Sequence, residues 1–413
     1  MSDISFVELI ESFEKMKKRL LILLCLPMIG FGQDSDNTSA LSAKDYLDRG
    51  RVNDGLEDHS GAIADYTEAI KIDPEYAKAY FNRGNAKNEL EDFFGAIADY
   101  TEAIRLVPEY AKAYFNRGNA KADFEDRLGA IADYTEAIIL DPEDALAYLN
   151  RGYAKDELGD YSGSIADYTE VIRLDPEDAL AYLNRGYAKD ELGDYSGSIA
   201  DYTEVIRLDP KDADGYFFRG DAKYYLEDYL GSIADYTEVI RLDPEDALVY
   251  LNRGYAKDEL GDYSGSIADY TEVIRLDPED ADGYFFRGGA KYNLEDYSGA
   301  ITDFTEAIRL DPEDAETYLW RGNAKYNLED YSGAITDFTE AIRLDPEDAE
   351  TYLWRGNARE NAGLSFCNDL KKACDLGNDN ACEALIVLGK SGKKLNKIKI
   401  KIDKLNIKLD KLE

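Results

Sequence analysis

The side chains of this protein that could carry out chemistry are 86 carboxylates, four cysteines and a single histidine. Carboxylates and histidine can transfer protons, and groups of His, Cys, Asp and Glu can hold a metal. His59 stands where equivalent segments of the chain mostly carry an aromatic residue, such as Tyr161. The sequence has no serine nucleophile elbow, no HExxH motif and no glycine-rich phosphate loop. We therefore expect no catalytic residue, no metal and no cofactor, and we give His59 a structural role.

One acidic segment, DPEDADG at residues 277–283, is similar in composition to a calcium-binding loop. The residues do not match the ligand positions of such a loop. Pro278 takes the first ligand position, and Gly289 takes the last, where a glutamate is required. Acidic residues also recur at equivalent turns along most of the chain, whereas a catalytic pair is expected only once. The carboxylates therefore indicate a solvated acidic surface, and the sequence predicts a protein that is not an enzyme.

The charge of the chain is strongly acidic and unevenly distributed. The 48 basic and 86 acidic residues give a net charge of −38. Residues 390–413 carry nine lysines against three acidic residues, a net of +6, so the rest of the chain carries −44. Nucleic-acid binding depends on basic side chains that neutralise phosphates, so we expect no nucleic-acid partner. A partner that is attracted by charge should be neutral or basic.

Most of the chain repeats one phrase of 34 residues, which reads YLNRGYAKDELGDYSGSIADYTEVIRLDPEDALA at 148–181. Each repeat has a glycine four residues after a fixed tyrosine, and nine of the ten prolines fall once per period. A helix breaker at one fixed place marks one turn per repeat. The recurrent tyrosines are Tyr46, Tyr80, Tyr114, Tyr148, Tyr182, Tyr216, Tyr250, Tyr284, Tyr318 and Tyr352.

Between these marks the sequence is patterned as two helices. The second helix shows the i, i+3, i+4, i+7 spacing of a single apolar face. Its ends are marked as well, since Asp175 can cap the next helix and Pro176 suits a first helical position. A helix hairpin of this kind cannot bury its apolar face alone, so the repeats must stack on one another. In one repeat that face consists of Phe93, Ala96, Ile97, Tyr100, Ala103 and Ile104.

The pattern resembles the tetratricopeptide repeat family over residues 44–376, with nine full repeats and a degenerate tenth. With the recurrent tyrosine at family position 4, Gly lies at 8, Ala or Ser at 20, Tyr or Phe at 24 and Pro at 32. The resemblance implies an all-α fold, a right-handed α-solenoid superhelix of stacked helix hairpins whose first helices face inward. One departure is an arginine where the family usually has leucine before the glycine, from Arg49 to Arg355. We expect this arginine to be structural and to pair with the acid that recurs at Asp99, Asp133 and Asp167.

In this family, position 6 of the first helix is among the residues that face the concave groove. An amide row could hold the backbone of a bound peptide, and exposed aromatics could anchor apolar side chains. The resemblance therefore implies a scaffold that binds a protein or peptide. Three alternatives remain: amides that only join neighbouring helices, aromatics that bind a carbohydrate or envelope polymer, and a structural spacer. The position-6 residues are Asn82, Asn116, Asn150, Asn184, Asn252, Phe218, Phe286, Trp320 and Trp354.

The N-terminal sequence resembles a secretory signal peptide. A basic head at residues 17–19 precedes ten apolar residues, a run too short to span a bilayer. We expect residues 16–32 to be the signal, residues 1–15 to be a spurious extension before the true start, and residues 33–43 to be a linker. The sequence thus predicts an exported protein of the periplasm, cell envelope or extracellular space, with an uncleaved anchor helix as the alternative.

The C-terminal segment FCNDLKKACDLGNDNACEAL, residues 366–385, resembles Sel1-like repeats, whose two helices are bridged by a cysteine pair. This resemblance implies a disulfide between Cys374 and Cys382, which leaves Cys367 unpaired, and a capping helix at residues 377–390. Residues 391–413 form a basic amphipathic tail with three heptads of leucine and isoleucine. The tail could dock its lysines on the acidic body, make the protein oligomeric or contact a membrane.

Overall fold

The computed structural model describes residues 41–390, and of the last three residues only the backbone. Within this range the chain forms α-helices and no strand, so the expected all-α fold is confirmed. The described residues divide into two compact units: unit 1 ends at Asp194, and unit 2 begins at Tyr195. The predicted signal peptide and the basic tail lie outside the described residues.

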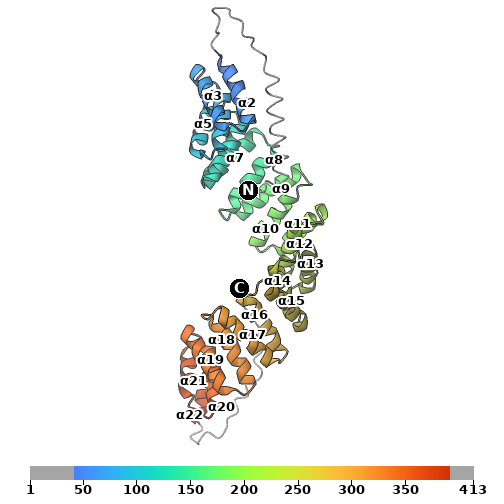
Figure 1. Ribbon diagram of the computed structural model, residues 1–413, viewed down its shortest axis with the longest axis vertical. Helices are drawn as coiled ribbons and strands as arrows, with labels where there is room; N and C mark the ends of the chain where they lie inside the picture. The colour runs from blue at the N-terminus through green and yellow to red at the C-terminus, as the bar shows by residue number, and fades with distance from the viewer. Residues whose placement is uncertain (1–40, 391–413) are drawn as a thin grey trace, which may run out of the picture. The chain divides into compact units, whose positions relative to one another are not determined.

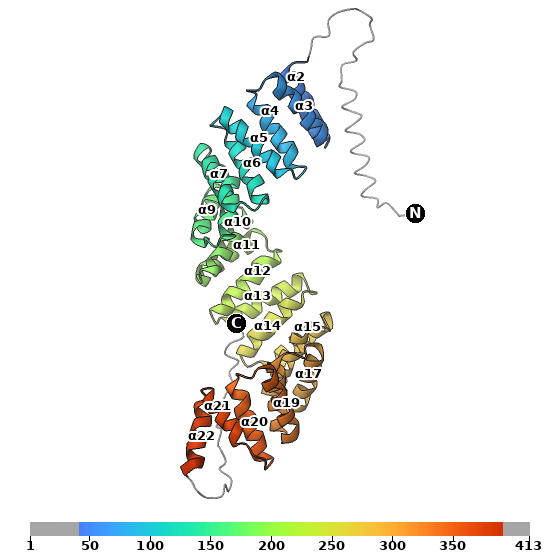
Figure 2. The ribbon, with the colours of Figure 1, turned by 90° about the vertical axis from the view of Figure 1, so that its left-hand side faces the viewer.

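Within each unit, a first and a second helix pack as a hairpin, and successive hairpins stack (Figures 1 and 2). Even labels mark first helices and odd labels mark second helices up to α21. Unit 1 contains α2 (Ala43–Gly55), α3 (His59–Ile72), α4 (Ala77–Asn88), α5 (Phe93–Leu106), α6 (Ala111–Asp123), α7 (Arg127–Leu140), α8 (Ala145–Asp156), α9 (Tyr161–Leu174) and α10 (Ala179–Glu191).

Unit 2 continues the same alternation and ends in two helices that depart from the repeat. It contains α11 (Tyr195–Leu208), α12 (Ala213–Tyr225), α13 (Tyr229–Leu242), α14 (Ala247–Glu259), α15 (Tyr263–Leu276), α16 (Ala281–Asn293), α17 (Tyr297–Leu310), α18 (Ala315–Asn327), α19 (Tyr331–Leu344), α20 (Ala349–Asn361), α21 (Cys367–Asp375) and α22 (Asp379–Lys390).

An aspartate and a glycine start the second helices. In α5, the Asp92 carboxylate accepts a hydrogen bond of 3.0 Å from the backbone N–H of Gly95, which caps the helix. A Cβ atom at Gly95 would lie only 2.1 Å from Asp92 Oδ2, so this cap requires glycine. The capping aspartates are Asp58, Asp92, Asp126, Asp160, Asp228, Asp262, Asp296 and Asp330.

The core of each repeat is a large ring of the second helix that packs against the glycine of the first helix. A Cβ atom at Gly84 would approach the Tyr100 ring to 2.7 Å, so the two helices meet at this point only because the residue is glycine. Small residues such as Ala96 complete the contact. The buried rings are Tyr66, Tyr100, Tyr134, Tyr168, Tyr202, Tyr236, Tyr270, Phe304 and Phe338.

First helices of successive repeats approach one another closely, as α2, α4, α6 and α8 do in unit 1 and α16, α18 and α20 do in unit 2. Except for α2, each of these first helices contacts the second helix of its own repeat, the second helix of the repeat before it and a neighbouring first helix. The position-6 residues lie on first helices.

The C-terminal end of unit 2 contains the disulfide that the resemblance implied. Cys374 on α21 is bonded to Cys382 on α22, with their Cα atoms 4.8 Å apart. Cys367, at the start of α21, is free and exposed. Leu370, Ala373 and Ala381 pack against Leu353 of α20, so the two last helices continue the core of the array.

Candidate functional site

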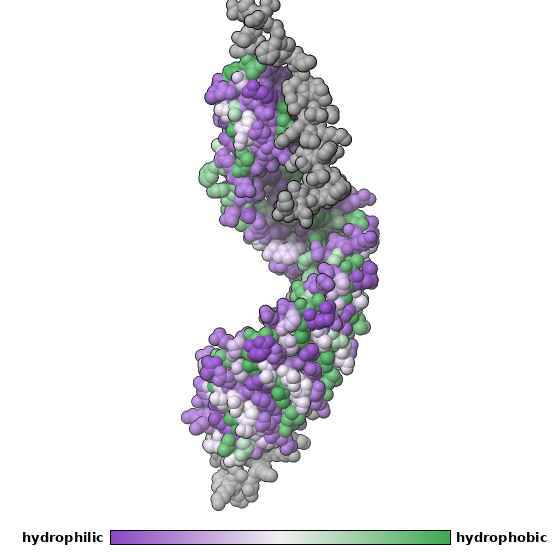
Figure 3. Space-filling model, viewed as in Figure 1, coloured by the Kyte–Doolittle hydropathy of each residue, from purple (hydrophilic) through white to green (hydrophobic). Residues whose placement is uncertain are grey.

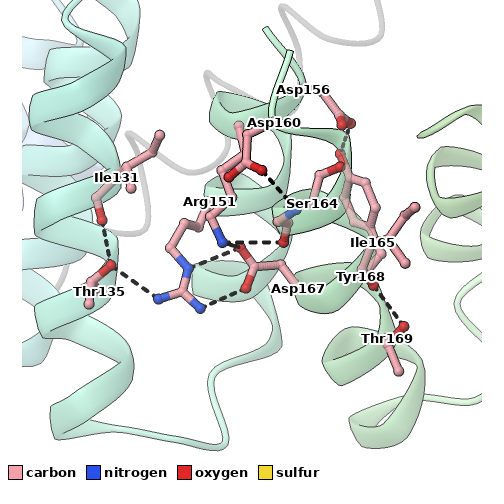
Figure 4. A network of polar contacts seen from close by, with 12 residues as sticks. Ile131, Thr135, Arg151, Asp156, Asp160, Ser164, Ile165, Asp167, Tyr168 and Thr169 are labelled. Atoms are coloured by element: carbon pink, nitrogen blue, oxygen red, sulfur yellow. Dashed lines mark hydrogen bonds and ion pairs between the residues drawn. The ribbon is translucent and has the colours of Figure 1, made fainter. Parts of the chain in front are cut away.

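An arginine recurs in the repeats, and Arg151 shows how it joins three helices (Figure 4). Arg151 on α8 donates from Nε and Nη2 to the two oxygens of Asp167 on α9, at 3.0 and 2.6 Å. Its Nη1 donates at 3.1 Å to the hydroxyl of Thr135 on α7, in the preceding repeat. The guanidinium also lies 5.6 Å from the ring centroid of Tyr148. One side chain thus ties its own hairpin to the hairpin before it.

The aspartate that receives this arginine is buried and has a second cation. Asp167 is 3% exposed, and Lys155 Nζ lies 2.7 Å from its Oδ2. The arginine, lysine and aspartate therefore occur as a set, which explains why arginine stands where the family usually has leucine. The structural role expected for the arginine is confirmed. Further such pairs are Arg83–Asp99, Arg117–Asp133, Arg219–Asp235, Arg253–Asp269, Arg287–Asp303 and Arg321–Asp337.

The arrangement changes at the two ends of the described array. Arg49 on α2 has no described helix before it, and its side chain is 53% exposed. At the other end, Arg355 donates to Asp369 at 2.8 Å, although that aspartate follows after 14 residues instead of 16. Arg359 replaces the lysine and donates to the same carboxylate at 2.6 Å. Sequence reasoning did not identify Asp369, because its spacing departs from the period.

Three of the five predicted groove asparagines bond to the preceding first helix. Asn116 Nδ2 donates to Asn85 Oδ1 at 2.8 Å, and Asn150 Nδ2 donates to Asn119 Oδ1 at 3.0 Å. Asn184 Nδ2 donates to the Tyr153 hydroxyl at 2.8 Å. In these three residues, an amide N–H joins neighbouring repeats, which agrees with the alternative that the amides join helices. Asn82 and Asn252 occupy the equivalent places on α4 and α14.

The expectation that Trp320 stands exposed in the groove is wrong. Its side chain is 5% exposed and packs against Phe304 and Ala324 in the core of unit 2. Its ring meets Tyr292 of the preceding first helix edge-on, with centroids 5.3 Å apart. The indole N–H donates to Glu316 at 3.2 Å. A ring that is covered in this way cannot offer its face to a sugar or to an apolar side chain.

The other predicted aromatics also make contacts within unit 2. Trp354 packs 5.7 Å from Tyr326, again on the preceding first helix. Phe286 lies 4.6 Å from Tyr255, and Phe218 lies 5.8 Å from Tyr202, all measured between ring centroids. All three rings remain partly exposed. Position 6 is thus an inter-repeat contact in both forms, through the amides of Asn116, Asn150 and Asn184 in unit 1 and through the four rings in unit 2.

Unit 1 contains a pocket of about 400 Å³ between three successive first helices, α4, α6 and α8. Its walls combine the rings of Tyr134 and Tyr153 with the methyl groups of two alanines. Of the predicted groove residues it includes Asn150. The full lining is Asn88, Asn119, Ala122, Asp123, Tyr134, Asn150, Tyr153, Ala154 and Glu157.

The polar atoms of this pocket are mainly hydrogen-bond acceptors. Asn88 Oδ1 is buried and has no hydrogen-bond partner among the described residues. Asp123 is exposed and forms no ion pair within residues 41–390. Glu157 is bound by Arg127, whose Nη2 lies 3.1 Å from it. Acceptors beside apolar walls suit a basic side chain with an aliphatic stem. Sequence reasoning missed Asn88 and Asp123, because they lie outside the positions that face the family's groove.

Asp258, a partly buried carboxylate near the end of the first helix α14, has a perturbed pKa. Desolvation raises the pKa of Asp258 to about 6, with smaller contributions from Glu259 and Asp262. The Tyr270 hydroxyl donates to this carboxylate at 2.7 Å. Burial and the neighbouring Asp258 in turn raise the pKa of Tyr270. These groups lie in the packing between two helices of one repeat.

Outside these contacts the surface is hydrophilic over much of the face in view, with hydrophobic residues between (Figure 3). Within residues 41–390, no group of three or more His, Cys, Asp or Glu side chains is arranged to hold a metal. His59 contacts Asp54 through Nδ1 at 2.9 Å, at the start of α3. None of the described helices is both long and apolar enough to cross a membrane.

Two family models match the chain. A model described as TPR repeat matches residues 56–90, 84–123, 288–329 and 322–363. A model described as tetratricopeptide repeat matches residues 115–166, 149–213 and 218–281. Together the matches cover well over half of the sequence. Among curated proteins, none matches it.

Several solved structures are similar to this chain. The C-terminal part of a TPR repeat-containing protein from Cytophaga hutchinsonii is 18% identical, with a TM-score of 0.52 over 59% of this chain and 98% of that chain. YrrB, described as a TPR protein with an unusual peptide-binding site, is 19% identical over 47% of this chain and 97% of that one, with a TM-score of 0.41. MamA is 23% identical over 42% of this chain and 96% of that one, with a TM-score of 0.40.

Proposed function

This chain belongs to the tetratricopeptide repeat family, and from that premise we propose that it is an exported, non-enzymatic scaffold that binds a basic protein or peptide segment on the concave side of unit 1. Repeat proteins of this architecture offer extended concave surfaces for partners. The net charge of −38 favours a partner that carries positive charge.

The pocket between α4, α6 and α8 is the observation that carries the proposal. A lysine or arginine side chain of the partner lays its stem against Ala122, Ala154 and the Tyr153 ring. Its charged end donates to the exposed Asp123 carboxylate.

Purified full-length protein, titrated with a panel of basic, neutral and acidic peptides and with glycans, tests this proposal. We expect micromolar or tighter binding of peptides that contain lysine or arginine, and weaker binding as salt is raised. Binding of glycans in preference to peptides, or of acidic peptides in preference to basic ones, contradicts it. Trp320 does not support the carbohydrate alternative, because its ring is buried.

The substitution Asp123→Asn tests the pocket within this function. Removing the unpaired carboxylate should weaken binding of a basic peptide about tenfold, or 1.4 kcal/mol, because a charged contact becomes a neutral one. Glu143→Gln removes an exposed carboxylate at the turn before α8 and serves as the matched control. If both variants lower the affinity equally, the loss reflects the net charge of the protein, and the pocket is not the binding site.

Export is part of the proposal and is motivated by the signal-like sequence of residues 16–32. We expect a mature protein that begins near Gln33 and is found outside the cytoplasm. N-terminal sequencing of the protein from its native cell tests this expectation. Recovery of peptides from residues 2–15 in the mature protein would overturn it.

A further inference from the structure

Two aromatic residues of unit 1 depart from the repeat and meet at its surface. Phe94 is the second residue of α5, where six other second helices carry serine. Phe124 lies in the turn before α7, where eight other repeats carry leucine. The two rings meet edge-on with centroids 4.7 Å apart, across two successive repeats. Phe94 nevertheless remains 71% exposed and Phe124 47% exposed, so the contact leaves much of both rings in water.

Two leucines extend this pair into a patch that spans two repeats. Leu128 is 72% exposed at the second position of α7, and Leu90 is 48% exposed in the turn before α5. Serine at the second position supports the same Asp-capped helix start, as Ser162 does in α9, so the fold does not require an apolar residue there. Neighbouring exposed apolar residues mark an interaction site. We call Leu90, Phe94, Phe124 and Leu128 the apolar ridge.

Exposed carboxylates border the apolar ridge. Three glutamates adjoin its residues in the sequence and form no ion pair within residues 41–390. This negative charge disfavours an anionic membrane or a nucleic acid, and it equally disfavours the same face of a second copy of the chain. The border therefore favours a partner with positive charge. The glutamates are Glu89, Glu91 and Glu125.

The basic side chains near the ridge in the sequence do not neutralise this border, because each is engaged elsewhere. Lys87 and Lys121 lie 2.8 and 2.7 Å from the buried aspartates of their own repeats. Arg127 Nη2 donates to Glu157 at 3.1 Å. The charge of the border is thus left for a partner to neutralise.

The backbone at the ridge offers no edge to which a strand could add. The N–H groups of Leu90, Glu91, Phe124 and Glu125 donate to carbonyl groups of their own turns at 2.9 to 3.1 Å. A partner segment must therefore satisfy its own backbone hydrogen bonds, as a helix does.

We propose that the apolar ridge binds an amphipathic helix of a partner protein, with an apolar stripe on one face and lysine or arginine on both sides of the stripe. The apolar stripe covers Phe94 and Leu128, and the basic side chains meet the bordering glutamates. This surface goes beyond the proposed function, because no ridge residue lines the pocket.

Binding of designed helical peptides to the purified full-length protein tests the inference. Two peptides share one face of leucines, and the residues beside that face are lysines in one peptide and glutamates in the other. We expect the peptide with lysines to bind about tenfold more tightly, and its affinity to fall about tenfold in the double variant Phe94→Ser, Leu128→Ser. Ile139→Ser removes a side chain that is 63% exposed near the other end of α7 and should leave the affinity unchanged. Equal affinities for wild type and double variant, or an equal loss in the control, overturn the inference.

A third peptide separates the ridge from the pocket. It has the composition of the peptide with lysines but a scrambled order, so it retains basic residues for the pocket and has no apolar face. Its affinity should be the same for wild type and the double variant. If this peptide does not bind at all, the proposed function fails and the inference stands on the helical peptide alone.

Photo-crosslinking locates the contact. A p-benzoylphenylalanine in the apolar face of the peptide with lysines should give adducts within residues 89–95 and 123–129, and none in the equivalent turn at residues 157–163. Adducts at other segments only overturn the inference.

Discussion

Asn323, on α18, is a buried amide without a hydrogen-bond partner. Its side chain is 1% exposed, and neither Nδ2 nor Oδ1 is bonded within the described residues. The equivalent Asn85 receives two donors at its Oδ1, the Tyr100 hydroxyl at 2.9 Å and the Asn116 amide at 2.8 Å. Asn323 has lost both kinds of donor, because Phe338 stands where Tyr100 does and Trp354 where Asn116 does.

The substitution Phe338→Tyr should therefore stabilise unit 2 by about 1 kcal/mol, since it returns a hydroxyl donor to Asn323. The matched control is Phe304→Tyr, because the equivalent position before that ring is Gly289, which offers no amide. The control should destabilise the protein, as it buries a hydroxyl without a partner. Chemical denaturation of both variants measures the difference. Equal effects of the two substitutions would contradict this account of Asn323.

Asp258 makes the stability of unit 2 depend on pH. Its pKa of about 6 in the folded protein exceeds the unfolded value of about 3.9, so the folded state binds the proton more tightly. This contribution to stability is fully present below pH 4 and is lost as the pH rises through 6. The difference in the free energy of unfolding between Asp258→Asn and wild type should therefore shift by about 2 kcal/mol in favour of the variant between pH 4 and pH 7.

The chain already carries asparagine at the equivalent position of another repeat, since Asn88 corresponds to Asp258. Denaturation midpoints between pH 4 and 7 provide the measurement, with Glu279→Gln as an exposed control. A stability difference between Asp258→Asn and wild type that stays constant over this pH range would show that the carboxylate is not desolvated.

The recurrent arginine, with its lysine and aspartate, determines how one helix hairpin packs on the next. Replacing Arg151 with leucine, the residue usual in the family, leaves Asp167 buried with only Lys155 as a partner. We expect Arg151→Leu to cost about 3 kcal/mol, because a buried ion pair loses one member. Arg49→Leu should cost about 1 kcal/mol or less, since Arg49 is half exposed and no described helix precedes it. If thermal denaturation shows equal losses of stability for Arg151→Leu and Arg49→Leu, Arg151 does not stabilise the contact between three helices.

The helix pattern could be predicted from the sequence, whereas the exposure of position 6 could not. The period of Tyr, Gly and Pro predicts the hairpins, because the glycine admits the ring and the proline lies in the turn between repeats. The expected cap is wrong in detail, since Asp178, and not Asp175, caps α10, which begins at Ala179 instead of Pro176. Burial of Trp320 depends on Tyr292 in the preceding repeat, a contact between helices that periodicity alone does not reveal. The same holds for the pocket, which combines side chains of three first helices.

Different parts of one acidic array have different roles. In the proposed function, the pocket of unit 1 binds a basic segment, and the ring contacts of unit 2 join successive repeats. The disulfide between Cys374 and Cys382 continues the array at its end. Near-identical repeats thus carry one set of packing residues throughout, while the few positions that differ determine what each part contacts.

The central claim is that the concave side of unit 1 engages a basic segment of a protein. The most direct measurement is photo-crosslinking in the native cell from Leu146, which is 59% exposed on α8, with Glu143 at the preceding turn as the control position. The account predicts an adduct from position 146 to a protein segment that contains lysine or arginine, and loss of this adduct in Asp123→Asn. No protein adduct, or the same adducts from positions 146 and 143, would contradict it.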